Sequence, residues 1–71
     1  MIINTAYTPY EKLVMTALDL VKEGRRIHYV EVTPDEAENI IDSADPEDIQ
    51  HLEIDSFTFL GYIPVYIRPD A

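Results

Sequence analysis

The chain has 71 residues, no cysteine and a formal net charge of −9. A chain of this length buries only about 60% of its unfolded surface, so we expect a single domain over residues 1–71 with a small core. The lack of cysteine excludes disulfides and thiolate chemistry. No basic leader and no membrane-spanning apolar run is present, and together these features favour a cytoplasmic protein.

The first expected element is a helix that begins at Pro9, with Thr8 as the N-cap and Glu11 closing a capping box. Gly24 is expected to end it, while residues 1–6 suit either a short strand or a loose arm. The bases Lys22, Arg25 and Arg26 lie where cations favour the negative end of a helix dipole, so we interpret them as helix-terminating residues. Apolar residues recur at the spacing of one helical face: Tyr10, Leu13, Val14, Ala17, Leu18 and Val21.

The middle of the chain is expected to form a strand, a second helix and a short helical turn. Residues 27–32 are apolar at both parities, which is typical of a strand covered on both faces. The second helix should open with another capping box at Thr33 and Glu36. Its apolar stripe is Ala37, Ile40, Ile41 and Ala44. Asp45-Pro46 starts the helical turn, which is expected to direct Ile49 and Leu52 inward.

Residues 54–68 hold two runs of β-branched and aromatic residues around Gly61, which predicts a β-hairpin. A three-residue loop, 59–61, with Gly61 left-handed in a G1-type bulge, would pair Phe57 with Ile63 and Thr58 with Tyr62. This loop brings all the odd-numbered apolar residues to one core face: Phe57, Phe59, Ile63, Val65 and Ile67. Pro64 has no N–H for a ladder, so the last strand is expected at a sheet edge or bulged.

These elements predict an α+β fold of the order α-β-α-α-β-β, in which a sheet of about three strands ends in a C-terminal hairpin and packs against two helices. In this arrangement residues 27–32 would lie parallel to a central strand at 54–58. The same order also fits a winged helix, with residues 46–51 as the recognition helix. Its acids Glu47, Asp48 and Glu53 would repel phosphates, so no direct contact with nucleic acid is expected.

Few residues are arranged for catalysis or metal binding. Two glycines cannot build a phosphate-binding loop, and Ser43 and Ser56 lack a nucleophile elbow. The acidic run lacks the spacing of an EF-hand, and His28 and His51 show no paired-ligand spacing. We therefore predict no catalytic residues, no cofactor and no metal, and a protein that is not an enzyme.

Acidity is concentrated in residues 33–55, which contain nine acids and no Lys or Arg: Asp35, Glu36, Glu38, Asp42, Asp45, Glu47, Asp48, Glu53 and Asp55. Such a run is often only a solvated surface. The more specific hypothesis is a surface that binds a basic protein partner, since uncompensated carboxylates can imitate phosphates. Tyrosines would add contact area. The predicted partner-binding residues are Glu36, Glu38, Asp42, Asp45, Glu47, Asp48, Tyr62 and Tyr66.

Two alternatives stay open. The first is a homodimeric structural module assembled through the sheet edge or the tyrosine face. The second is a winged-helix-like regulator of transcription or genome packaging, which would need a basic surface made of Lys12, Lys22, Arg25, Arg26 and Arg68.

A strand running into Thr33-Pro34-Asp35-Glu36-Ala37 and the hairpin end Leu60-Gly61-Tyr62-Ile63-Pro64-Val65-Tyr66-Ile67 resemble small, uncharacterised accessory proteins encoded by phages and prophages. The resemblance covers about the last forty residues and rests on capping and turn chemistry. It implies a protein that binds and modulates host machinery, including acidic DNA mimics that inhibit restriction or CRISPR nucleases. It transfers no catalytic residue.

Overall fold

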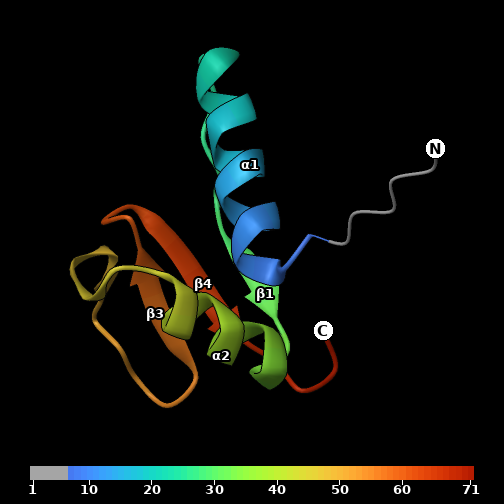
Figure 1. Cartoon of the computed structure of the whole chain (residues 1–71), viewed down its shortest axis with the longest axis vertical. Helices are drawn as coiled ribbons and strands as arrows, with labels where there is room; N and C mark the ends of the chain where they lie inside the picture. Colours follow the sequence, from blue (N-terminus) through green and yellow to red (C-terminus); the bar gives the residue numbers. More distant parts are fainter. Residues whose placement is uncertain (1–6) are drawn as a thin grey trace, which may run out of the picture.

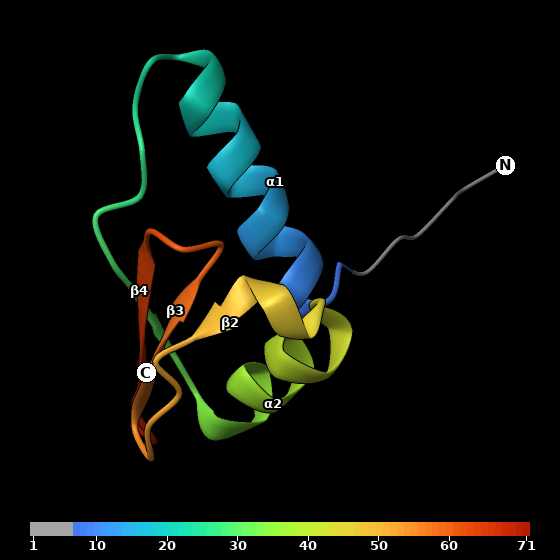
Figure 2. The same cartoon turned by 90° about the vertical axis from the view of Figure 1, so that its left-hand side faces the viewer.

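The computed structural model describes residues 7–71 and has the expected α+β class. Two helices pack on one face of a four-stranded sheet (Figures 1 and 2). The predicted arm or strand at residues 1–6 lies outside the described residues. The elements are α1 (Pro9–Lys22), β1 (Val30–Val32), α2 (Pro34–Ser43), the 3-10 turn η1 (Pro46–Asp48), β2 (Ile49–Gln50), β3 (Ser56–Phe59) and β4 (Ile63–Ile67).

Both capping boxes are confirmed. In α1, Thr8 Oγ1 accepts from the Glu11 N–H at 3.2 Å, and in α2, Thr33 Oγ1 accepts from the Glu36 N–H at 3.2 Å. The end of α1 is also as expected: Gly24 has a φ of +73°, and the following N–H of Arg25 donates to the Leu20 carbonyl at 2.7 Å. The left-handed residue thereby satisfies a carbonyl that the helix end leaves open.

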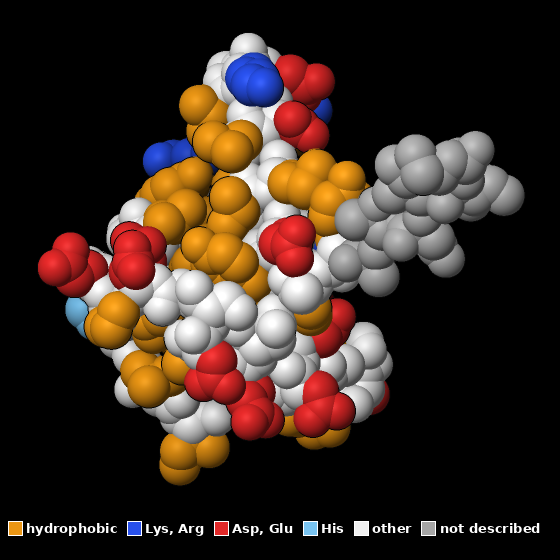
Figure 3. Space-filling view, in the orientation of Figure 1, with side chains coloured by type: hydrophobic (Ala, Val, Ile, Leu, Met, Phe, Trp, Pro, Cys, Tyr) orange, Lys and Arg blue, Asp and Glu red, His pale blue; other side chains and the backbone are white. Residues whose placement is uncertain are grey.

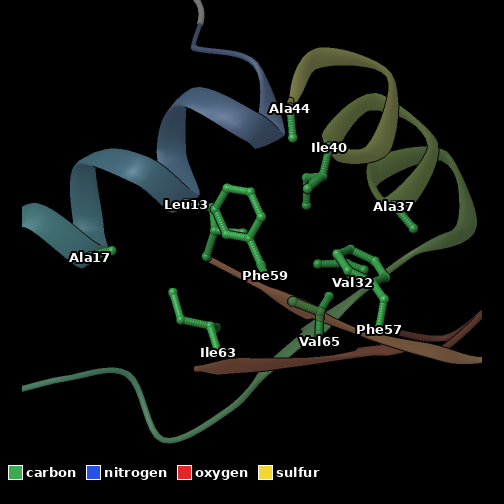
Figure 4. Close-up of a cluster of buried hydrophobic side chains, with 10 residues drawn as sticks. All are labelled: Leu13, Ala17, Val32, Ala37, Ile40, Ala44, Phe57, Phe59, Ile63 and Val65. Carbon is green, nitrogen blue, oxygen red and sulfur yellow. The ribbon is translucent and has the colours of Figure 1, made fainter. Parts of the chain in front are cut away.

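The core lies between the two helices and the inner face of the sheet, and it confirms the odd-numbered face of the hairpin. Figure 4 shows Phe59 pointing from the sheet to a place between Leu13 and Ile40. Its ring meets the Tyr10 ring edge-on, with centroids 6.0 Å apart. The buried apolar residues are Leu13, Ala17, Val32, Ala37, Ile40, Ala44, Phe57, Phe59, Ile63 and Val65; Ile67 is half-buried.

The predicted register of the hairpin is wrong by two residues. Phe59 pairs with Ile63 and Phe57 with Val65, so the loop is 60–62 rather than 59–61. Leu60 and Gly61 both take positive φ, +57° and +81°, as in a type I′ turn. Because the left-handed residues are Leu60 and Gly61, the turn begins at Leu60. Phe59 therefore remains in β3, where it pairs with Ile63. The parity of the core face is unchanged, because a two-residue shift preserves it.

The predicted strand order is also wrong. The sheet runs β1-β4-β3-β2, so β1 lies parallel to β4 and not to β3, and β4 is an interior strand. The N–H of Arg68 donates to Val32 at 2.7 Å and that of Ile67 donates to Asp55 at 2.8 Å. Backbone nitrogens along a strand point alternately to its two neighbours, so the nitrogen of Pro64 points toward β1, as that of Arg68 does. Pairing with β1 begins at Val65, which is why the proline is tolerated and why residues 27–29 stay outside the ladder.

The predicted short helix is only one 3-10 turn, and it is followed by a strand that the sequence analysis missed. Ile49 and Gln50 pair antiparallel with the outer edge of β3. A winged helix would need a recognition helix at residues 46–51, so that alternative layout is wrong. Ile49 is half-buried as predicted, whereas Leu52 is 58% exposed because the chain leaves the sheet at His51, whose φ is +52°.

Candidate acidic binding site

The acidic residues of the middle segment include an exposed ridge on α2. Asp35, Glu38 and Asp42 are all exposed, and their spacing puts them on one side of the helix, away from the buried Ala37 and Ile40. Figure 3 shows Asp and Glu side chains over the lower half of the molecule, around α2 and η1, and others along α1, including at its top beside Lys and Arg side chains. In that view the Lys and Arg side chains lie higher, around α1.

None of the nine middle carboxylates has a cationic partner within 4.0 Å among residues 7–71. The ion pairs in this part of the chain join Arg25 to Glu23 at 3.9 Å and Arg68 to Glu31 at 3.7 Å, and both lie outside the acidic run. Among the described residues, the carboxylates of residues 33–55 are therefore not neutralised by ion pairs, as the hypothesis of a basic partner requires.

A groove of about 540 Å³ runs beside the α2 ridge. We define the acidic groove by its three carboxylates, Glu38, Asp42 and Asp55, together with its apolar residues, Ala37, Ile41, Ile54, Ile67, Pro34 and Pro69. Ile54 is 99% exposed, although full burial of such a side chain gains about 1.5–3 kcal/mol. An exposed isoleucine beside carboxylates can contact a partner segment that carries both aliphatic and cationic groups.

The predicted acidic residues differ in how accessible their carboxylates are to a binding partner. Glu38 and Asp42 line the acidic groove, and Asp45 and Glu47 are exposed near η1. Glu36 is half-buried, and its Oε1 accepts from the Thr33 N–H at 2.8 Å, so this carboxylate already serves the capping box. Asp48 is half-buried.

The structure separates one of the two predicted tyrosines, Tyr66, from the acids of α2, whereas the turn that holds Tyr62 lies beside η1, because the Leu60 N–H donates to the Asp48 carbonyl at 2.8 Å. Val65 is buried beneath the helices, so the neighbouring Tyr66 points to the opposite face of the sheet. There its ring lies 6.2 Å from that of Tyr29 and 5.6 Å from the guanidinium of Arg68. Tyr62 follows Gly61 in the hairpin turn and is 40% exposed.

Ile41, Ile54 and Asp55 line the groove but are not among the predicted partner-binding residues. Ile54 lies in the loop before β3, so the parity of the hairpin could not place it beside α2. Ile41 was assigned to the core stripe of α2, where it is half-buried against the core and also lines the groove.

No group of three or more His, Asp or Glu side chains gathers within residues 7–71 to hold an ion. Across the same residues, neither helix has the length and apolarity needed to cross a bilayer.

Comparisons of the chain with protein-family models, with curated proteins and with solved structures found no match. Fold and site together thus define a small α+β protein with a groove whose three carboxylates form no ion pair with any other residue of the part described, residues 7–71.

Proposed function

We propose that the protein is a non-enzymatic interaction module whose acidic groove binds a basic surface on another protein. The observation that carries this proposal is that, among residues 7–71, no cation lies within 4.0 Å of the nine carboxylates in residues 33–55. The resemblance of the TPDEA and LGYIPVYI segments adds the setting: an accessory protein of a phage or mobile element that covers a nucleic-acid-binding surface of a host protein.

A basic partner would remove the mutual repulsion of these carboxylates. Asp35, Glu38 and Asp42 lie one helical turn apart along α2, and like charges at such spacing are destabilising by a few tenths of a kcal/mol per pair. A cationic segment converts that repulsion into attraction and speeds encounter by long-range steering. The charge is exposed, so the effect must fall as the Debye length drops below about 10 Å.

The apolar part of the acidic groove favours a mixed ligand over a purely cationic one. Ile54 projects into solvent, and Ile41 and Ile67 line the groove beside it. Lysine and arginine carry aliphatic stems that can cover such residues while their charged heads meet the rim. We therefore propose a partner segment in which basic and aliphatic residues alternate or share a face.

Two variants with the same change in charge and composition test the proposal. The groove variant is Glu38→Gln with Asp42→Asn and Asp55→Asn; the control variant is Glu23→Gln with Asp19→Asn and Asp70→Asn, all exposed and outside the groove. The probes are a labelled peptide of alternating lysine and leucine and a peptide of alternating lysine and glycine. Titrations are run at about 50 mM and about 300 mM salt, which spans strong and weak screening.

We expect the lysine-leucine peptide to bind more tightly than the lysine-glycine peptide and to weaken with salt. Exposed charge contacts contribute roughly 0.2–1 kcal/mol each, so the groove variant should raise Kd about 3- to 150-fold. The control variant should raise it less than about threefold, the low end of that range. Equal losses in both variants, or no binding of either peptide at low salt, would refute the groove as the binding site.

A further inference from the structure

The C-terminal half of α1 extends beyond the body of the protein. Figures 1 and 2 both show this helix rising past the β3–β4 turn. Leu13 and Ala17 are buried, but Leu18 and Val21, the last two residues of the apolar stripe, are each 56% exposed. The stripe that the sequence marks as a core face therefore continues where no other described element covers it.

Val14, which is half-buried against the core, and the exposed Leu18 and Val21 form the α1 ridge. They are spaced i, i+4 and i+7, which puts them on one side of the helix. Figure 3 shows hydrophobic side chains along α1 that continue toward the β3–β4 hairpin. The segment after α1 leaves the ridge open: it faces α1 across a separate groove of about 560 Å³, whose α1 residues are Pro9, Lys12, Leu13, Thr16 and Leu20.

We propose that a second copy of this chain covers the α1 ridge, with the two α1 helices packed antiparallel about a two-fold axis near Leu18. In such an arrangement the same patch serves both subunits, and each residue contact occurs twice. Val14 of one copy then meets Val21 of the other, because the two lie on opposite sides of the axis. Coiled-coil-like packing of aliphatic residues at this spacing is a common way to bury a helix stripe.

Charge placement on α1 argues for a second copy and for its direction. Glu11 and Lys22 are exposed and eleven residues apart, so they lie within about 20° of one another around the helix and about 16 Å apart along it. Both lie within about 40° of Leu18, on one flank of the α1 ridge. Two antiparallel helices bring the same flanks together, so Glu11 of each copy faces Lys22 of the other.

A parallel pair would instead bring opposite flanks together, so Glu11 and Lys22 of one copy would not meet their counterparts in the other. The capping box uses only Oε1 of Glu11, so the rest of the carboxylate can meet the lysine. The complementarity is thus built into the sequence of one helix, and a second copy of this chain satisfies it without any other partner.

The expected affinity is modest. A stable interface buries about 800 Å² per partner, and a ridge of three aliphatic side chains on a helix of 14 residues, about 21 Å long, reaches only the lower part of the range. We therefore expect a dimer with a Kd on the order of micromolar. It is independent of the proposed function, since the ridge lies on α1 whereas the acidic groove is lined by α2, β4 and the loop before β3.

Sedimentation velocity of the full chain from about 5 to about 500 µM tests the dimer, because that range brackets a micromolar Kd. The ridge variant is Leu18→Gln with Val21→Gln, two exposed positions where glutamine keeps helix propensity. Its matched control is Leu52→Gln with Ile54→Gln, which removes one leucine and one β-branched residue from another exposed surface. Circular dichroism establishes that each variant is folded.

The ridge variant should weaken the dimer by about tenfold or more, and the control should change Kd by less than about threefold. A wild-type monomer at every concentration, or a dimer that only the control variant weakens, would overturn the proposal. Lys22→Glu gives a second readout that leaves the apolar side chains intact. It should weaken the dimer, and the double variant Glu11→Lys with Lys22→Glu should restore it; a dimer indifferent to Lys22→Glu overturns the antiparallel arrangement.

Discussion

Both helices begin with a Thr-Pro-x-Glu capping box, but the first capping box is exposed and the second is partly buried. In the first capping box the Thr8 N–H lies 3.4 Å from Glu11 Oε1, in an exposed setting. In the second, the Thr33 N–H lies 2.8 Å from Glu36 Oε1 and the bond is partly buried. Hydrogen bonds to a charged acceptor strengthen as they shorten and lose water. Removing the second N-cap should therefore lower the free energy of unfolding more than removing the first.

The surroundings of the two caps increase the expected difference in stability between the Thr8→Ala and Thr33→Ala variants. The Tyr10 N–H also donates to Asn39 Oδ1 at 3.0 Å, so α1 keeps a tie to α2 when Thr8 is changed. Thr33 directly follows the buried Val32, and the turn that it caps carries the buried Ala37. Loss of an N-cap costs about 0.5–2 kcal/mol. We expect about 0.5–1 kcal/mol for Thr8→Ala, at the low end, and about 1.5–2 kcal/mol for Thr33→Ala.

Thermal unfolding followed by circular dichroism measures this difference. In a domain of this size 1 kcal/mol shifts Tm by about 4–8 °C, so Thr33→Ala should lower Tm by roughly 6–16 °C and Thr8→Ala by roughly 2–8 °C. Thr33→Ser keeps the capping oxygen and should recover most of the loss. All samples need one protein concentration, since a dimer makes Tm depend on concentration. A loss in Thr8→Ala that equals or exceeds that in Thr33→Ala would refute the reasoning.

Two further substitutions test the hairpin and the sheet. Leu60 has a φ of +57°, which costs an ordinary residue about 1–2 kcal/mol, so Leu60→Asn should raise the free energy of unfolding in urea by up to about 1 kcal/mol; an unchanged or lower value contradicts the turn assignment. Pro64→Val supplies an N–H toward the β1 side and should extend the ladder toward Tyr29. Hydrogen exchange would show the new amide protected, and rapid exchange would count against the extension.

Local chemistry made part of the fold predictable. The Thr-Pro-x-Glu segments determine where both helices begin, and the odd-numbered apolar residues of the hairpin determine its inner face, because both signals act over a few residues. The order of the strands could not be predicted in this way. Pairing β1 with β4 depends on contacts across more than thirty residues, and residues 27–32 are apolar at both parities. Strand β2 was missed because two residues give no period.

The site was predictable to a similar extent. A count of charges located the acidic segment, but a count cannot say which acids stay exposed, and Glu36 is partly occupied by its capping box. The separation of Tyr66 from the acids did follow from the sequence. If the odd residues of β4 face the helices, the even-numbered Tyr66 must point to the opposite face of the sheet, away from the acids of α2.

The α1 stripe shows what periodicity can and cannot establish. Its spacing marks Leu18 and Val21 as residues to be covered, yet both are 56% exposed, because a helix of 14 residues reaches past strands of three to five. The pattern identifies an apolar face but not the surface that covers it. An antiparallel second copy would cover that face and pair Glu11 with Lys22, which makes the exposed half of the stripe and the charges beside it parts of one feature.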